Sequence, residues 1–266
     1  MITITVLHNE FEVYQRSKSG FSVLIEAFGK RILFDTSLSD DIIKNAERGK
    51  ISLREIDCIV LSHGHTDHTE GLRFIDFSNV KSIVAHPDCF QKKFSERGGY
   101  IGIPLCLDYL KRKTNLVLTK EPFWIEEDKI VFLGQIPRKT DFEAKTPVGY
   151  LENGEADFVL EDSAIAINTN RGIVIVTGCS HSGVCNIIEY TKGVCQSNKI
   201  YAVLGGFHLF NNRVIDKTIE FIKREHIERV YPAHCVSEYG FAESVSYTHL
   251  RAHETRHDLV CRLLLE

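Results

Sequence analysis

The sequence lacks long apolar runs and any excess of positive charge. No stretch of its 266 residues approaches the roughly 18 apolar residues of a membrane-spanning helix, so we do not expect a membrane span. Its 32 Lys and Arg are outnumbered by 36 Asp and Glu, giving a formal charge of -4, whereas a general nucleic-acid surface needs a basic face. Clusters such as Lys111-Arg112-Lys113 are interpreted as a solvated helix end. We therefore expect a small-molecule substrate, with no nucleic acid and no membrane as partner, and the sequence leaves the oligomeric state open.

The sequence also lacks paired cysteine spacings and, at its start, a basic segment. The eight cysteines lie at positions 58, 89, 106, 179, 185, 195, 235 and 261, without the short pairs of a zinc ribbon or a disulfide scaffold. Met1 passes directly into an alternating strand pattern with no basic segment, which gives no sign of export. We expect a reducing, cytoplasmic setting.

The composition is that of an ordinary globular enzyme, with 43% hydrophobic and 26% charged residues. A chain of this length can bury a sizeable core as one large domain. Apolar or alternating runs predict strands, and apolar residues at helical spacing predict helices. Strands are expected at residues 2–7, 22–28, 31–34, 56–61, 82–85, 115–119, 123–125, 129–133, 164–168, 172–176, 200–204 and 229–231, and helices at 40–48, 184–190 and 214–224, with residues 29–30 as a two-residue hairpin turn.

The densest chemical signal is His63-Gly64-His65-Thr66-Asp67-His68, which follows the apolar run Ile56 to Leu61. If the backbone stays extended through Gly64, His63 and His65 point to the same side and can ligate one metal ion. The turn that follows swings Asp67 and His68 toward a second position. Imidazole beside carboxylate suits Zn²⁺, with Fe or Mn as alternatives. The competing interpretation is a solvated polar turn, which has no need of so many potential ligands.

This stretch resembles the metal-binding signature His-x-His-x-Asp-His of the metallo-β-lactamase superfamily. The flanking residues extend the resemblance to the branch of metal-dependent hydrolases labelled dihydropterin ribofuranosylaminobenzene phosphate synthases, over about residues 1 to 240. The segments that carry it are Ile32-Leu33-Phe34-Asp35-Thr36, Thr69-Glu70-Gly71-Leu72, Thr177-Gly178-Cys179-Ser180-His181-Ser182-Gly183, Gly205-Gly206-Phe207-His208-Leu209 and Pro232-Ala233-His234-Cys235. The resemblance implies an α/β fold, a metallo-β-lactamase-type αββα four-layer sandwich. Its metal site lies along one edge, where each candidate ligand follows a strand.

The resemblance also implies further ligands from the second half of the chain. In the superfamily a third histidine, a bridging aspartate and a last histidine complete two metal positions. Here Cys179 stands where the aspartate would follow Gly178, and no His-Thr-Pro-Gly-His segment precedes the second-half strands. We expect His181 and His234 to complete the metal ligands His63, His65, Asp67 and His68. His208 is expected close by, as a ligand or as an acid–base group.

Several of these residues admit a plainer interpretation. His181 could cap the helix that follows it, and His234 could be an ordinary residue at a strand end. Cys179 as a thiolate would bind zinc strongly, but a buried neutral thiol fits the sequence equally well. His86, beside Pro87, could contact substrate or simply be a satisfied histidine.

Two features near the motif are assigned supporting roles. By the resemblance, Asp35 ends a strand beside the metal strand, where it can accept a hydrogen bond from a ligating imidazole and fix its tautomer. The alternative is a turn aspartate paired with Thr36 or Ser37. The glycine-rich segment Gly98 to Pro104 is either a mobile flap over the site or a plain surface loop.

The end of the chain differs in character. From Val245 onward the sequence resembles a translated sequencing adapter, so residues 1–244 are expected to form the single domain, truncated at its C-terminus, and 245–266 a non-native tail. This tail is expected to be poorly packed or loosely helical. His249, His253 and His257 imitate a metal site by their helical spacing, but the interpretation assigns them no role.

The predicted activity is metal-assisted hydrolysis of a small ester or phosphoester, and the resemblance favours a phosphorylated substrate. One or two bound ions would lower the pKa of water toward neutrality. Asp67 is the residue expected to orient that water, and His208 the one expected to protonate the leaving group. The alternative is a non-catalytic or redox metal-binding protein on the same fold.

Overall fold

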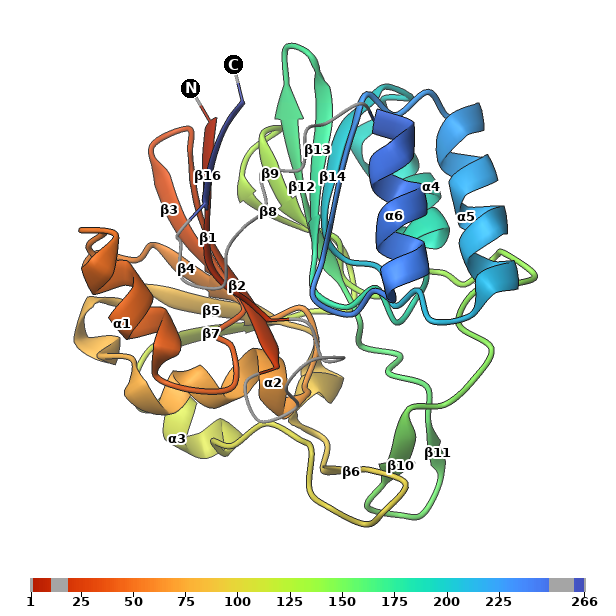
Figure 1. Cartoon of the computed structure of the whole chain (residues 1–266). Coiled ribbons are helices and arrows are strands. Elements are labelled where there is room, and N and C mark those ends of the chain that lie inside the picture. The colour runs from red at the N-terminus through yellow and green to blue at the C-terminus, as the bar shows by residue number, and fades with distance from the viewer. Residues whose placement is uncertain (1, 11–18, 249–260, 266) are drawn as a thin grey trace.

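Two large β-sheets lie face to face between outer layers of helices in the computed structural model, which describes residues 2–10, 19–248 and 261–265 (Figure 1). Helices α1 to α3 accompany the first sheet, and α4 to α6 cover the outer face of the second. The predicted αββα four-layer sandwich is confirmed. Each sheet hides one apolar face against the other sheet and one against its helices, which is why so many of its strands are apolar throughout.

The first sheet has seven strands in the order β16-β1-β2-β3-β4-β5-β7. Its strands β1, β2 and β3 are antiparallel neighbours, whereas β3, β4, β5 and β7 run parallel. The bounds are β1 Ile2–Glu10, β2 Gly20–Ala27, β3 Lys30–Phe34, β4 Cys58–Val60, β5 Ser82–Ala85, β7 Asn115–Leu118 and β16 Cys261–Leu265. The helices of this half are α1 Asp41–Arg48, α2 Thr66–Thr69 and α3 Leu107–Lys111, with 3-10 turns η2 Glu70–Phe74, η3 Phe77–Asn79 and η4 Pro87–Phe90.

The second sheet has six strands in the order β15-β14-β13-β12-β9-β8. Strands β13, β14 and β15 run parallel, and the remaining neighbours are antiparallel. The bounds are β8 Phe123–Glu126, β9 Ile130–Phe132, β12 Ala164–Thr169, β13 Gly172–Thr177, β14 Ile200–Gly206 and β15 Arg229–Ala233, with helices α4 Val184–Cys195, α5 Asn212–Arg224 and α6 Glu238–Thr248.

A small third sheet was not predicted. It joins β6 (Lys93–Phe94), β10 (Gly149–Leu151) and β11 (Ala156–Asp157) in the order β11-β10-β6, and it projects from the lower edge of the sandwich in Figure 1. Strands of two or three residues carry too little alternation to stand out in a sequence. This sheet matters later because Lys93 and Asp157 belong to it.

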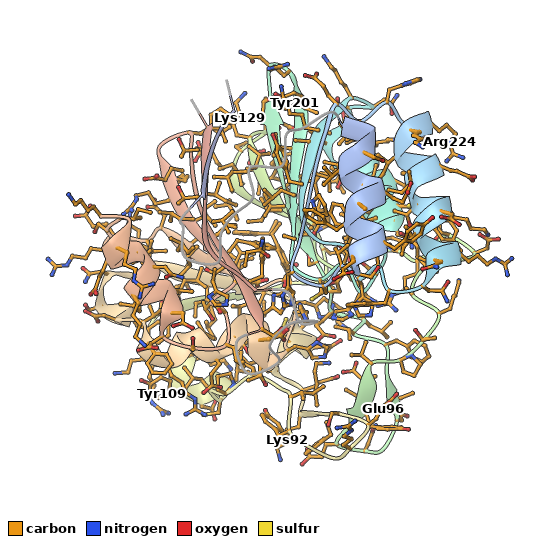
Figure 2. All side chains as sticks on the ribbon, viewed as in Figure 1. Lys92, Glu96, Tyr109, Lys129, Tyr201 and Arg224 are labelled. Carbon is orange, nitrogen blue, oxygen red and sulfur yellow. The ribbon has the colours of Figure 1, made fainter. Side chains whose placement is uncertain are left out.

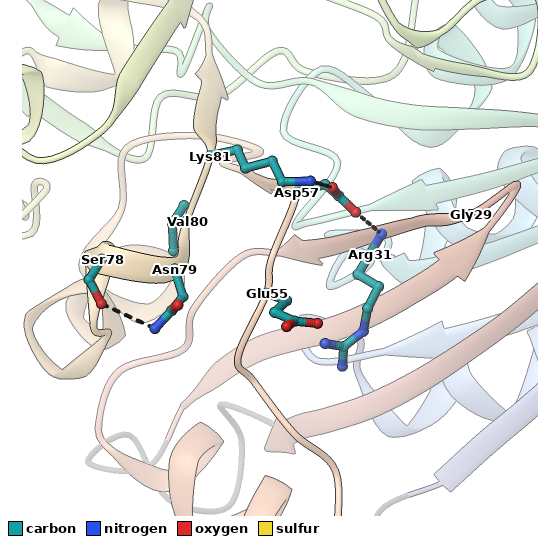
Figure 3. A pocket seen from close by; sticks show the side chains of 8 residues that line it. All are labelled: Gly29, Arg31, Glu55, Asp57, Ser78, Asn79, Val80 and Lys81. Carbon is teal, nitrogen blue, oxygen red and sulfur yellow. Dashed lines mark hydrogen bonds and ion pairs between the residues drawn. The ribbon is translucent and has the colours of Figure 1, made fainter.

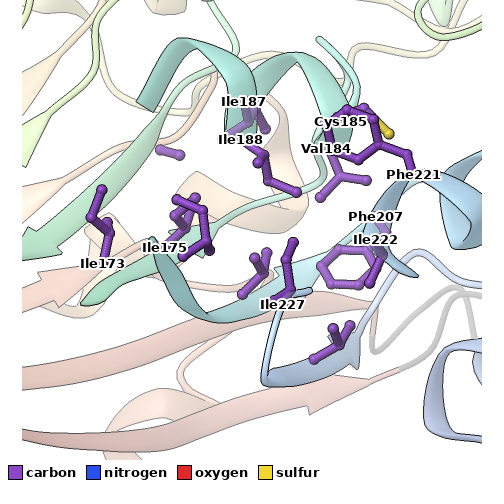
Figure 4. Packing of buried hydrophobic residues seen from close by; sticks show 14 of the residues in the cluster. Ile173, Ile175, Val184, Cys185, Ile187, Ile188, Phe207, Phe221, Ile222 and Ile227 are labelled. Carbon is purple, nitrogen blue, oxygen red and sulfur yellow. The ribbon is translucent and has the colours of Figure 1, made fainter. Parts of the chain in front are cut away.

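Three apolar cores match the four layers. One lies between the sheets, where Phe34 of β3 and Phe132 of β9 are fully buried. A second fills the space between the second sheet and its helices and includes Ile175, Ile187 and Phe221 (Figure 4). The third lies between the first sheet and α1, α3 and the 3-10 turns. Charged side chains such as Lys92 and Arg224 lie at the periphery (Figure 2).

The hairpin between β2 and β3 differs from its prediction by one residue. The two-residue turn is Phe28-Gly29 instead of Gly29-Lys30, because Ala27 pairs with Lys30. Both turn residues have positive φ, 50° and 75°, as a type I′ hairpin turn requires. The sequence suggested the later pair because phenylalanine is a poor candidate for a left-handed position.

The C-terminal residues also differ from expectation. Cys261–Leu265 form strand β16, antiparallel to β1 at the edge of the first sheet, where we expected a loose or helical tail. The free edge of β1 offers unpaired backbone groups, and an apolar segment can satisfy them. Helix α6 continues past position 244 to Thr248. His249, His253 and His257 lie outside the described residues, and the domain boundary remains a proposal.

The parallel strands position the site. The carboxyl ends of β3, β4 and β5 in one sheet, and of β13, β14 and β15 in the other, are followed by all the segments predicted to carry ligands. Among the described residues, no helix is long and apolar enough to cross a membrane.

Candidate metal centre

Three imidazoles form a first donor group. His63 and His65 follow β4, and His181 follows β13 from the other sheet. His63 Nε2 lies 3.1 Å from His65 Nδ1, and the ring centroids of the three residues lie 4.7 to 5.1 Å apart. All three side chains are buried. The structure thus brings residues 118 positions apart in sequence to one point.

A second donor group lies next to the first. It consists of Asp67 and His68 in α2 and His234 after β15. Asp67 Oδ2 lies 3.1 Å from His234 Nε2 and 3.7 Å from His68 Nε2. The rings of His63 and His68, one from each group, have centroids 4.3 Å apart. All six residues predicted as metal ligands therefore gather in one cluster, although ligation itself stays a prediction.

Cys179 lies between the two groups. Its Sγ is 3.1 Å from His68 Nε2. It also belongs to two sets of potential donor atoms that lie within 4.8 Å of one another, one with Asp67, His68 and His234 and the other with His63 and His181. A sulfur in this position can reach a cation held by either group. From the sequence alone this thiol is either a metal donor or a buried neutral thiol, and the geometry favours a donor.

The electrostatics fit a cation between these side chains. Burial, reinforced by the neighbouring imidazoles, holds the pKa of His63 and His181 well below the usual histidine range. Burial would raise the pKa of Asp67, but His68 and the hydrogen bond with His234 lower it overall. Neither ring nitrogen of His181 has a hydrogen-bond partner among the described residues. Neutral imidazoles, a carboxylate and buried unpaired nitrogens are the donor set that Zn²⁺ binds.

Asp35 fixes two of these imidazoles from behind, as predicted. Its Oδ2 accepts from Ser62 Oγ at 2.7 Å and lies 2.7 Å from His68 Nδ1. Ser62 Oγ in turn lies 2.9 Å from His63 Nδ1. A carboxylate accepts only, so His68 carries its proton on Nδ1, and the hydroxyl relays the same preference to His63. Both rings then present the lone pair of Nε2 to the cluster.

Close packing around Asp35 explains one glycine of the second half. A Cβ atom at Gly178 would collide with Ser62 Oγ and come within 2.9 Å of Asp35 Oδ2. Only glycine lets the loop after β13 approach this hydrogen-bonded pair.

Several loops that carry the site contain a non-glycine residue with left-handed backbone. Asp35, Ser180, His208 and His234 have φ values of 56°, 57°, 48° and 52°, in the left-handed region that non-glycine residues rarely adopt. Such conformations persist where the surrounding structure over-determines them, and they cluster at functional sites.

His208 lies at the side of the cluster. Its ring centroid is 4.5 Å from that of His181 and 5.2 Å from that of Phe210, which is 43% exposed. His208 is partly exposed and belongs to none of the donor sets found among the described residues. This position suits a group that contacts the substrate, and it suits a metal ligand less well.

The remaining predicted residues have clear places. His86 Nδ1 accepts from Asp88 N at 3.1 Å and so caps η4, whereas its buried Nε2 has no hydrogen-bond partner among the described residues, so both interpretations of His86 stay open. His226 follows the end of α5 and is exposed. The glycine-rich segment lies directly against the metal motif, since Thr66 N donates to Ile101 O and Thr66 Oγ1 to Gly102 O.

Sequence reasoning missed a group of buried charges beside the first donor group. Lys93, Asp157, Glu161 and Asp162 are all at most 3% exposed. Asp162 Oδ2 accepts from both N and Oγ of Ser182, next to His181. Nothing in the sequence marked them, because Lys, Asp and Glu are nearly always exposed.

A hollow with a volume of about 610 Å³ lies elsewhere, at the amino ends of β3, β4 and β5 (Figure 3). It is therefore at the opposite edge of the sheet from the cluster. Asp57, which lines it, accepts from the backbone N of Arg31 and from Lys81 Nζ. We assign no function to it.

An αββα sandwich that gathers histidines, a carboxylate and a thiol at the carboxyl ends of its strands defines a metal-binding class of protein. Residues 17–99 match the model of the metallo-β-lactamase superfamily. A protein of Methanocaldococcus jannaschii named 7,8-dihydropterin-6-methyl-4-(beta-D-ribofuranosyl)-aminobenzene-5'-phosphate synthase is 36% identical over 239 residues, 82% of this chain and 81% of the relative. This chain belongs to the metallo-β-lactamase superfamily.

Other relatives agree with this assignment. An uncharacterized protein of the same archaeon is 34% identical over 241 residues, 88% of this chain and 90% of its own length. The crystal structure of Tm1679, a metal-dependent hydrolase of the β-lactamase superfamily, superimposes with a TM-score of 0.81 at 27% identity, covering 100% of this chain and 99% of that one. A diphosphatase of the PhnP family shares the fold at 14% identity, with a TM-score of 0.55 and coverage of 100% and 98%.

Proposed function

We propose that this protein is a metal-dependent hydrolase that acts on a small ester or phosphoester. The observation that carries the proposal is the cluster of His63, His65 and His181 beside Asp67, His68 and His234, with Cys179 between them. Such a cluster has room for two ions, and we propose Zn²⁺, with Fe or Mn as alternatives. When bound, the ions would supply a water of lowered pKa and an electrophile for the substrate's oxygen.

The chain's own residues supply the other steps. Asp67 is the carboxylate best placed to orient the attacking water, because its Oδ2 faces both His68 and His234. His208, partly exposed beside His181, is proposed to protonate the leaving group. The exposed ring of Phe210 packs edge-on against His208 and offers an apolar surface to substrate.

A phosphorylated substrate is proposed on two grounds. The archaeal relative is named for a 5'-phosphate product. In this chain, Arg138 is partly exposed, its Nη2 donates to the carbonyls of Phe158 and Val159, and its charge contributes to lowering the pKa of His181. A fixed guanidinium near the cluster is suited to an anionic group of the substrate.

We propose a cytoplasmic setting. The cysteines between positions 58 and 235 are all free thiols, as is usual in a reducing compartment.

A hydrolysis screen tests the function. Zinc-loaded and chelator-treated protein should be compared on p-nitrophenyl acetate, p-nitrophenyl phosphate and bis(p-nitrophenyl) phosphate, with metal content measured on the same samples. We expect turnover of at least one ester that disappears with the metal and returns when it is restored. Stoichiometric metal without turnover of any of the three would favour a binding or redox role instead.

His208→Ala separates an acid–base role from ligation. We expect the variant to keep the metal content of the parent and to lose roughly 10²- to 10⁴-fold in rate, because the leaving group departs without a proton. Elemental analysis beside steady-state kinetics provides the measurement. A variant that loses metal together with activity would make His208 a ligand and refute the proposed role.

A further inference from the structure

The ammonium group of Lys93 is buried beside the first donor group. Lys93 is 0% exposed, and its Nζ lies 2.8 Å from Asp157 Oδ2 and 3.0 Å from Glu161 Oε1. Burial alone would lower the pKa of Lys93, but the two carboxylates raise it overall, so the side chain stays charged. Burying three charged groups is costly and adds little stability compared with an apolar core. Their retention calls for a reason other than stability.

These charges flank the segment that carries His63 and His65. Asp157 Oδ1 accepts from Val159 N at 2.8 Å, which leaves Oδ2 facing Lys93 and, 4.0 Å away, His65 Nε2. Glu161 Oε1 also accepts from Gly64 N at 3.3 Å, between the two histidines. His65 is 6% exposed, and its Nε2 has no hydrogen-bond partner among the described residues.

The orientation of His65 differs from that of its neighbours. His63 and His68 point Nε2 into the cluster and have their Nδ1 atoms held by Ser62 and Asp35. His65 instead points Nδ1 toward His63 Nε2. To offer a lone pair on Nδ1 it must carry its proton on Nε2, the tautomer opposite to theirs. A group that accepts this proton is therefore needed on the far side of the ring, where Asp157 lies.

We propose that Lys93, Asp157 and Glu161 form a positioning triad that holds His65 in its Nε2–H tautomer and aims Nδ1 at the first metal position. Lys93 pairs with both carboxylates and holds them in place, Glu161 fixes the backbone at Gly64, and Asp157 faces the ring. Asp35 orients the rings of His63 and His68. Without Asp157, His65 would be the one histidine of the motif with no side chain behind its ring to orient it. This inference rests on the metal centre of the proposed function.

The isosteric variant Asp157→Asn tests it. An amide in this place keeps an acceptor oxygen but loses the negative charge that favours the Nε2 proton and strengthens the ligand. We expect zinc at the first position to bind roughly 10- to 100-fold more weakly, as is typical when the carboxylate behind a ligating histidine is removed. Zinc at the second position, with Asp67, His68 and His234, should keep its affinity. Competition with a chromophoric chelator resolves the two steps, and ¹⁵N chemical shifts of the histidines report the tautomer of His65 without any metal.

Glu143→Gln is the matched control. Glu143 is also a buried carboxylate, but it accepts from Cys185 N and Asn186 N at the start of α4 and contacts no proposed ligand. It should change thermal stability without changing either zinc affinity. Lys93→Met, if it folds, should weaken the first position as Asp157→Asn does.

The outcomes separate the two proposals. If the parent protein binds no zinc at the cluster, the proposed function fails. If the parent binds zinc but Asp157→Asn retains the parent's affinity and His65 tautomer, the triad is only structural and the inference is overturned. Equal weakening of both positions, matched by Glu143→Gln, would overturn it as well.

Discussion

The double variant His63→Ala, His65→Ala is expected to lose the metal of the first position completely and, with it, all metal-dependent hydrolysis. His63 Nε2 and His65 Nδ1 lie 3.1 Å apart and together make up two of the three imidazoles of that position. The donors that remain, His181 and Cys179, fall short of the three protein ligands of an open zinc site. Elemental analysis of protein purified in the presence of zinc measures the effect.

The control for this experiment is His226→Ala, which removes an exposed imidazole at the end of α5. It should bind as much metal as the parent. Circular dichroism of all three proteins shows whether the fold is retained. Equal metal content in the double variant and the parent would remove the basis for the proposed centre.

Cys179→Ala is expected to reduce the bound metal to about one ion per chain, because the thiol lies within reach of both donor groups. The hydrolysis rate should fall by more than the roughly 10- to 100-fold that is typical when a group hydrogen-bonded to a metal ligand is removed. Cys179→Asp should restore much of both, since a carboxylate oxygen also binds zinc. Metal content and hydrolysis rates measured together test the series.

Cys58→Ala provides the comparison, because Cys58 is a buried thiol inside β4 that belongs to the core between the sheets and to no set of potential metal donors among the described residues. It should leave the metal unchanged. A Cys179→Ala protein with the parent's metal content and hydrolysis rate would show that this thiol does not bind the metal.

Much of the fold could be predicted because most strands of the two large sheets lie within apolar runs of four or more residues in the sequence. Those strands, helices α1, α4 and α5 and the order of ligand segments along the chain follow from periodicity and resemblance, whereas α6 was not predicted. The β2–β3 turn was misplaced because Phe28 adopts a left-handed conformation that its type disfavours. Strands β6, β10 and β11 were missed because two or three residues carry no period.

The site was predicted in part, for a related reason. Histidine, aspartate and cysteine are easily recognised as candidate ligands when they stand in a motif. Asp35 was predicted from the strand that it ends. The triad around Lys93 could not be found, because its members lie up to 68 positions apart and each resembles an ordinary surface charge. Only the small sheet, where Lys93 and Leu151 pair across β6 and β10, brings them together.

The long-range contacts of the cluster bear on when it forms during folding. Asn9 Oδ1, at the end of β1, accepts from the backbone N of His234, 225 positions away, and Asp67 meets His234 across 167 positions. Closing loops of this size costs conformational entropy before the contacts contribute any stability. Folding is therefore slow, and such contacts form at a late step. The donors from β4 and β15 therefore meet only after both sheets have docked. Refolding should proceed at the same rate with and without zinc, as stopped-flow fluorescence can measure, and zinc should slow only unfolding.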